Sequence, residues 1–337
     1  MRKQRYTAKR GFTILLVMVL LMIVIAVVSV NSGKMNLSPI EVFNVLLGKG
    51  TEKQNLIVFE FRLPRIILGV LVGFGMGASG CIMQSLLRND MASPGTLGIS
   101  SGSGLFVLIF VVLFASKGMS SAIALPLLAF IGGMTAAALI FILSYRRGRD
   151  ISPTGLILTG VALSSGYSAA TTLLTLKLDQ NQMDFMQRWS AGSLWGDDWK
   201  YLAILAPWTL ILLAYVIYKS RVLNTLHLGN QTATGLGVAV KPEFLGLSIA
   251  AVALSSGSVA LGGNFFFVGM IAPHLAKRLV GPNHKFLMPA SCLAASIIVL
   301  LADTITRTIS LGSDIPTGIV ITVLSTPYFL YLLAKAN

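Results

Sequence analysis

The run FTILLVMVLLMIVIAVVSV, from Phe12 to Val30, decides the class of fold. It holds 19 residues and no charged side chain, and a helix needs about 20 mostly apolar residues to cross the hydrocarbon core of a bilayer. The run is longer than the apolar region of about 7–15 residues in a signal peptide, and no clear A-x-A cleavage site follows it. We therefore expect a retained spanning helix. Five basic residues precede it, namely Arg2, Lys3, Arg5, Lys9 and Arg10.

The rest of the chain has the composition of a membrane protein. Of its 337 residues, 55% are hydrophobic and 11% are charged, and the mean hydropathy is +0.79. Soluble domains carry about 25% charged residues, so soluble and disordered classes are excluded. Cys81 and Cys292 both lie in apolar runs, which predicts neither a disulfide framework nor a cysteine metal site. The net charge of +14 is scattered between apolar segments, and this favours membrane topology over nucleic-acid binding.

Ten segments are candidates for spanning helices, so we predict an all-α integral membrane protein. Placing the N-terminus inside puts 16 Lys and Arg but only three acidic residues in the cytoplasmic segments, against ten basic and nine acidic residues outside. This asymmetry follows the positive-inside rule, which predicts that both termini are cytoplasmic. We expect one membrane domain over 1–337, with the eighth segment broken by Pro273. The segments are 12–30, 66–87, 96–114, 119–143, 154–176, 199–218, 244–261, 265–280, 286–302 and 315–334.

The second segment carries a face of small residues, Gly69, Gly73, Gly77 and Gly80. Such a face lets helices approach closely in lipid, where no hydrophobic force draws them together. The run Gly73-Phe-Gly-Met-Gly also resembles a nucleotide-binding loop, but no strand precedes it. We therefore predict close helix packing.

The fifth segment carries hydroxyl groups that recur partly at i, i+4, i+7 and i+11, on one helical face. Two interpretations stay open. The hydroxyls could form hydrogen bonds between helices, or they could line a wetted translocation path. They belong to Thr154, Ser164, Ser165, Ser168, Thr171, Thr172 and Thr175.

No catalytic, metal or ATP-binding apparatus is recognisable in the sequence. There is no G-x-x-x-x-G-K-[ST] motif, no nucleophile motif with a base, and no metal-ligand spacing among the three histidines. Intramembrane ionisable residues usually mark ion pathways, yet only Asp303 is a candidate here, and Arg307 follows it at i+4. We expect a local ion pair between them. The chain is predicted to conduct cargo without an energy source of its own.

An ordered set of motifs after the first segment resembles the FecCD family, the permease subunits of bacterial ABC importers for iron(III)-siderophores, haem and cobalamin. Its members have ten helices, cytoplasmic termini and the type II ABC importer architecture, which matches the prediction reached above. The motifs are Arg62-Leu-Pro-Arg65, 79–84, Arg88-Asn89, 92–102, 267–274, 281–285, 289–291, Ala302-Asp303 with Arg307, 315–318 and 327–333.

The resemblance assigns roles to residues on both sides of the membrane. It implies that Arg62, Arg65 and Arg307 receive acidic residues of an extracytoplasmic binding protein, and that Ser164, Ser168, Thr171, Thr172 and Thr175 line the path. It also implies a cytoplasmic coupling segment at about 219–243 that fits a groove of the ATPase. Asn230 and Gln231 stand where the family usually has an acid, and Asp90 stands where it has proline. The coupling residues are Leu226, Leu228, Gly229, Asn230, Gln231, Ala233, Leu236 and Gly237.

The function implied is that of a multi-pass permease subunit in a bacterial cell membrane, importing an iron(III)-siderophore. Its partners would be a second permease subunit, identical or related, two ATP-binding subunits and the binding protein, besides membrane lipid. No cofactor is expected on this chain, and ATP would bind the partner subunits. Alternatives are a haem or cobalamin importer of the same family and an ion-coupled secondary transporter. A membrane enzyme would need a convergent nucleophile and base or a metal set, which the sequence lacks.

Overall fold

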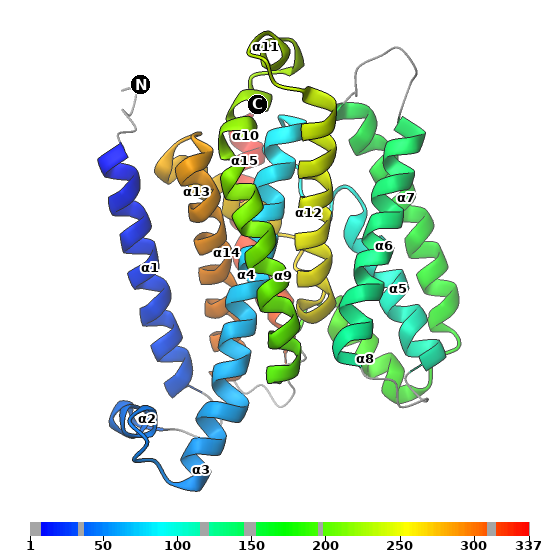
Figure 1. Ribbon diagram of the computed structural model, residues 1–337. Coiled ribbons are helices and arrows are strands. Elements are labelled where there is room, and N and C mark those ends of the chain that lie inside the picture. Colours follow the sequence, from blue (N-terminus) through cyan, green and yellow to red (C-terminus); the bar gives the residue numbers. More distant parts are fainter. Residues whose placement is uncertain are drawn as a thin grey trace.

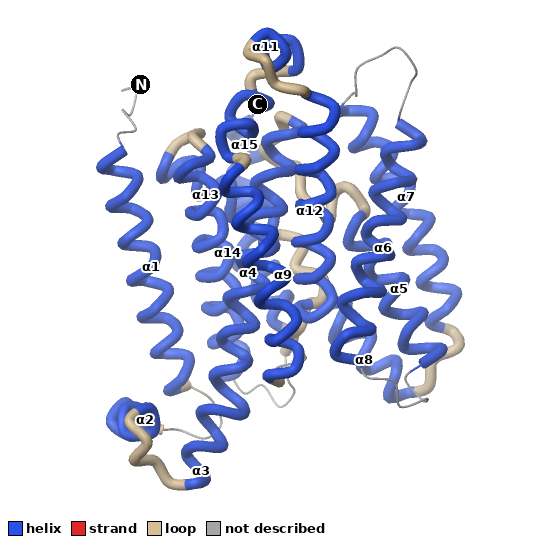
Figure 2. Tube along the Cα trace, viewed as in Figure 1, coloured by secondary structure: helices blue, strands red, loops and turns tan. Residues whose placement is uncertain are grey.

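The computed structural model describes residues 8–32, 37–114, 121–144, 153–194, 198–308 and 315–336, and every regular element in those ranges is a helix (Figure 2). Basic residues 2, 3, 5, 146, 147 and 149, which contributed to the predicted orientation, lie outside these ranges. Helix α1 (Ala8–Asn31) begins, and helix α15 (Thr317–Ala336) ends, at the end of the bundle that carries α11 (Asn230–Gly235), opposite α2 (Pro39–Leu46) and α8 (Gln180–Ser190) (Figure 1).

Each of the ten predicted segments coincides with one helix. By length and composition, seven of the described helices can cross a membrane, and α5 and α15 hold shorter apolar stretches. The count of ten spans and the location of the termini stay predictions. The ten helices are α1 (Ala8–Asn31), α4 (Leu63–Leu87), α5 (Ile99–Phe114), α6 (Ser121–Ser144), α7 (Pro153–Thr175), α9 (Trp199–Tyr218), α12 (Val240–Gly262), α13 (Val268–Val280), α14 (His284–Thr308) and α15 (Thr317–Ala336).

Short helices occupy the polar connections at the two ends of the bundle. Three of them, α2, α3 and α8, begin with a capping box, in which the N-cap side chain and the residue three positions later bond each other's backbone amide. The shorter helices are α2 (Pro39–Leu46), α3 (Glu52–Asn55), the π-helix η1 (Leu56–Arg62), α8 (Gln180–Ser190), α10 (Ser220–His227) and α11 (Asn230–Gly235).

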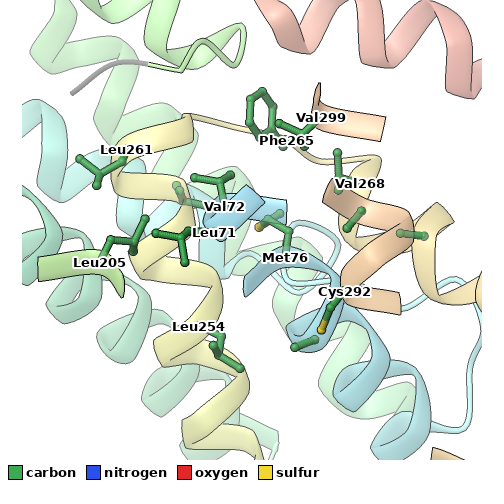
Figure 3. Packing of buried hydrophobic residues seen from close by; sticks show 14 of the residues in the cluster. Leu71, Val72, Met76, Leu205, Leu254, Leu261, Phe265, Val268, Cys292 and Val299 are labelled. Atoms are coloured by element: carbon green, nitrogen blue, oxygen red, sulfur yellow. The ribbon is translucent and has the colours of Figure 1, made fainter. Parts of the chain in front are cut away.

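Helix α4 lies at the centre of the bundle and is buried along almost its whole length. A Cβ atom at Gly73 would overlap the backbone of Ser296, one at Gly77 the carbonyl of Ser291, and one at Gly80 the carbonyl of Gly269. The close packing predicted from the glycine face is therefore confirmed. Figure 3 shows the apolar side chains around this contact, with Leu71 and Met76 of α4 among them.

The same helical rod begins earlier than position 66, because α3, η1 and α4 run on without a break from Glu52 to Leu87. Pro64 stands in the first turn of α4, where its missing N–H leaves the carbonyl four residues earlier without a helical donor. The π-helix that precedes it accommodates this loss. Arg62 and Arg65 therefore both belong to this continuous helical rod, which fixes their positions relative to each other.

The eighth segment was expected to be broken by Pro273, and this expectation was wrong. Pro273 lies inside α13, which runs continuously from Val268 to Val280. The proline has no N–H to offer the carbonyl of Gly269, and Gly80 of α4 packs against that carbonyl. One turn further on, Gln84 Nε2 donates to the carbonyl of Met270 at 2.8 Å. Helix α4 thus packs closely against this turn of α13 and adds a side-chain hydrogen bond to it.

Candidate docking, coupling and translocation sites

The three arginines predicted to receive a binding protein lie together, at the end of the bundle opposite α11. Asp303, near the end of α14, is fully buried and holds two of them. Arg65 Nη2 lies 3.0 Å from Asp303 Oδ1, and Arg307 Nε lies 2.9 Å from Asp303 Oδ2. The predicted local pair of Asp303 and Arg307 is confirmed. We call Arg62, Arg65, Arg307 and Asp303 the outer arginine cluster.

The cluster also fastens the end of α1 to the bundle. Arg62 is buried and donates through Nη1 to the carbonyl of Val30. Arg307 donates through Nη2 to the hydroxyl of Ser29, one residue earlier on α1. The cluster therefore joins α1, the start of α4 and the end of α14. Charge-assisted hydrogen bonds of this kind are stronger than neutral ones, above all where water is excluded.

Access to the arginines differs within the cluster. The side chains of Arg65 and Arg307 are 21% and 19% exposed, whereas the whole Arg62 residue is 5% exposed. A carboxylate approaching from outside would thus reach the edges of Arg65 and Arg307. Arg62 contributes its charge from behind them.

The coupling residues lie at the opposite end of the bundle, where the chain leaves α9, forms α10 and α11 and returns as α12 (Figure 1). Gly229 has φ +108° and Gly237 has φ +83°, values that L side chains rarely adopt. These two glycines bound α11 and let it project from the membrane helices. Leu228 and Leu236 are 62% and 64% exposed beside it, whereas Leu226 and Ala233 are buried. Asn230 and Gln231 form its first turn.

An ion pair closes the base of the coupling segment. Lys219, at the end of α9, lies 2.6 Å through Nζ from Oε1 of Glu243, in the first turn of α12. This hydrogen bond raises the pKa of Lys219 above its ordinary value, since the carboxylate favours the charged ammonium. The pair holds the end of α9 next to the start of α12, and α10 and α11 lie between these two points in the chain.

The segment after α4 contacts the coupling region, which the sequence did not indicate. Arg88 ends α4 with φ +50°, and its Nη1 would lie 3.2 Å from a Cβ atom at Gly229. Asp90, the departure from the family's pattern, pairs with Lys277 of α13 at 2.7 Å. A cleft of about 550 Å³ opens here, lined by Leu87, Arg88, Asn89, Asp90, Thr154, Ile157, His227 and Lys277.

The hydroxyl groups of α7 are divided between two environments. Ser168 and Thr172 are exposed, whereas Ser164, Thr171 and Thr175 are half-buried. Four of the five donate to carbonyls of their own helix, at 2.7–3.0 Å, and Ser164 also lies beside Gly98, the residue before α5. Hydrogen bonds between helices are made instead by Ser144, which donates to Thr159, and by the paired hydroxyls of Thr135 and Tyr167. The path-lining role of the five residues stays a prediction.

The comparison with protein families decides the identity of the fold. The model of the FecCD transport family matches residues 20–335. The chain belongs to the FecCD transport family. It is accordingly a multi-pass membrane permease and not an enzyme.

Relatives of this FecCD permease match it over nearly their whole length. It is 44% identical to the iron(3+)-hydroxamate import system permease protein FhuG of Bacillus subtilis, over 94% of this chain and 95% of the relative. It is 35% identical to the iron-uptake system permease protein FeuC of the same organism, with the same coverage of 94% and 95%. A metal-chelate type ABC transporter, solved in an inward-facing conformation, matches with a TM-score of 0.81 and 28% identity over 96% of this chain and 99% of that one.

Proposed function

We propose that this chain is the permease subunit of an ATP-driven importer that takes up an iron(III)-siderophore delivered by an extracytoplasmic binding protein. The observation that carries the proposal is the full-length similarity to FhuG, whose name specifies iron(3+)-hydroxamate. The fold similarity to a metal-chelate transporter supports it. ATP would bind two separate partner subunits, and a second permease subunit, identical or related, would complete the path.

The choice of siderophore over haem rests on the difference in identity between FhuG and one haem permease. Identity is 44% to FhuG and 34% to the hemin transport system permease protein HmuU of Yersinia pestis. Because the iron stays chelated by its carrier, the permease needs no metal ligands of its own. Within the described residues, no group of three or more His, Cys, Asp or Glu side chains could hold a metal ion.

The outer arginine cluster would receive the binding protein. Two guanidinium groups with about a fifth of each side chain exposed present planar donors to an acidic side chain. Asp303 holds both in place, so little side-chain entropy is lost when the partner arrives. Complementary charge of this kind sets encounter rate and register more than final affinity.

The coupling segment would carry the movements of the ATPase to the membrane helices. Leu228 and Leu236 expose apolar side chains at the tip of a projecting element, as expected of a helix that fits a groove. The exposed Ser168 and Thr172 on α7 would line the path together with its partly buried hydroxyls. A hydroxyl that already donates to its own helix keeps its lone pairs, so it would offer cargo an acceptor and no donor.

The test is reconstitution of the permease with its ATPase subunits in lipid nanodiscs and in proteoliposomes. We expect a loaded binding protein to stimulate ATP hydrolysis, and radioactive ferric hydroxamate to enter the vesicles only when ATP is present. A Leu236→Glu variant should lose the ATPase subunits during purification, whereas Leu47→Glu, an equally exposed leucine at the other end of the molecule, should retain them. Uptake that collapses only when a proton gradient is dissipated would instead establish a secondary transporter.

A further inference from the structure

A buried histidine ties the coupling segment to two membrane helices. His284 is the first residue of α14 and is 1% exposed. Its Nδ1 lies 2.8 Å from Oδ1 of Asn224 on α10, and its backbone N–H donates to the same oxygen at 2.9 Å. On the other side of the ring, Nε2 is hydrogen-bonded to the hydroxyl of Ser85 on α4. One imidazole thus links α10, α14 and α4.

The surrounding hydrogen bonds fix the orientation of each group. Asn224 accepts twice through Oδ1 and donates through Nδ2 to Oδ1 of Asn283 at 3.2 Å. An amide oxygen can accept two bonds, so Nδ1 of His284 is the donor on that side. His227, the last residue of α10, faces the same ring with centroids 6.2 Å apart. Asn224 and His227, which lie one turn apart near the end of α10, therefore both face His284.

We infer that His284 is the positioning residue through which the coupling segment moves the inner ends of α4 and α14. The inference rests on the proposed function. A displacement of α10 would move the ring with it, because the hydrogen bonds are directional and the ring is buried, where an unpaired polar group is costly. The other contacts are less directional, because Leu223 and Leu226 of α10 pack in the apolar core and Arg88, an exposed side chain, lies beside Gly229.

Helix α4 then carries the movement further. Ser85 lies only a few residues beyond Gly80 and Gly77, which hold α4 against α13 and α14 through backbone contacts. A shift received at Ser85 is therefore shared by three helices. Allosteric coupling of two sites requires such a connected element, whose arrangement both sites can bias.

The experiment uses the complete complex with ATPase subunits and binding protein, and it measures cargo imported per ATP hydrolysed. We expect His284→Ala and Asn224→Ala to lower that ratio at least about fivefold, the lower end of typical coupling strengths. His284→Gln, which can still donate to Asn224 and accept from Ser85, should recover part of it. The matched control is His274→Ala, because the ring of His274 on α13 faces Tyr328 of α15.

Three results would separate the possible failures. If import and hydrolysis fall in proportion in every variant, or only the melting temperature falls, His284 is a packing residue and the inference is wrong. If His284→Ala does not assemble, Ser85→Ala is the milder variant, because it removes the bond to the ring and a bond within α4 to the carbonyl of Cys81. An unchanged ratio in that variant would equally overturn the inference. A wild-type complex without stimulated hydrolysis would overturn the proposed function itself.

Discussion

Arg65 and Asp303 stand 238 positions apart in the chain, yet the guanidinium of Arg65 donates through Nε to the buried carboxylate of Asp303 at 3.0 Å. The contact joins the start of α4 to the end of α14. Arg307 occupies the second carboxylate oxygen, so a single acid neutralises charge on two helices. The arginines predicted to meet a partner protein are thus held by an internal carboxylate before that partner arrives.

Removing that carboxylate charge should destabilise the permease. We expect Asp303→Asn to lower the free energy of unfolding by about 3–5 kcal/mol, because it leaves two partly buried cations without their partner. Thermal unfolding of the purified chain in detergent measures the effect. The control is Asp198→Asn, which weakens only the exposed pair with Lys200 and should cost less than about 1 kcal/mol. Equal losses in the two variants would contradict the assigned importance of Asp303.

Docking should depend on the planar shape of the arginines as well as on their charge. Arg307→Lys keeps the positive charge but loses the fork that can bind one carboxylate while facing another. We expect roughly a tenfold weaker affinity for the binding protein, about 1.4 kcal/mol, with folding retained. Biolayer interferometry on nanodisc-embedded complexes measures it. Lys200→Met, on the same side of the molecule, should leave the affinity within twofold, and an unchanged affinity in Arg307→Lys would remove Arg307 from the docking site.

The glycine contact gives a prediction with an internal control. A Cβ atom at Gly80 would overlap the carbonyl of Gly269, so Gly80→Ala should destabilise the chain by about 1–3 kcal/mol. Gly166, inside α7, has no atom within 4 Å of its Cβ position. There the same substitution should be neutral or stabilise by up to about 1 kcal/mol, since alanine favours helix. The unfolding midpoints of the two variants measure this difference. An unchanged midpoint in Gly80→Ala would contradict the close approach of α4 to Gly269.

Alkaline pH should loosen the coupling segment. The pKa of Lys219 is raised above its ordinary value of 10.5 by the hydrogen bond to Glu243. A raised pKa in the folded state means that this contribution to stability is complete below pH 10.5 and disappears as the pH rises through the higher folded value. The protection factors of α10 and α11 in hydrogen exchange, which correct for base catalysis, should therefore fall above pH 10.5, and Lys219→Met should remove that fall. A Lys200→Met variant that behaved like Lys219→Met would trace the effect to general alkaline unfolding.

The sequence pattern predicted the long helices and the contacts between residues close together in the chain. The apolar runs indicated all ten long helices, because hydrocarbon demands unbroken apolar length. Spacing alone indicated the glycine face and the pair of Asp303 with Arg307, since residues four apart share a helical face. The resemblance to the FecCD family carried the function, and the comparisons confirmed it.

Contacts between distant segments were beyond such reasoning. Nothing in the periodicity pairs Arg65 with Asp303, or Ser85 and Asn224 with His284, because these contacts arise only when helices pack. The short helices were missed for a different reason. Their capping boxes, such as Ser38 with Glu41, are readable in sequence, but they lie in polar stretches that a search for spanning segments passes over.

The glycine contact of α4 also limits how this transporter can change shape. Sliding of one helix past another requires side chains that switch between alternative rotamers, and a glycine pressed on a backbone carbonyl has none to switch. Helices α4, α13 and α14 must therefore keep their mutual register through the whole transport cycle. The deformation that opens either side falls on the loosely covered helices around them, and in α7 only 11% of the spanning window is buried.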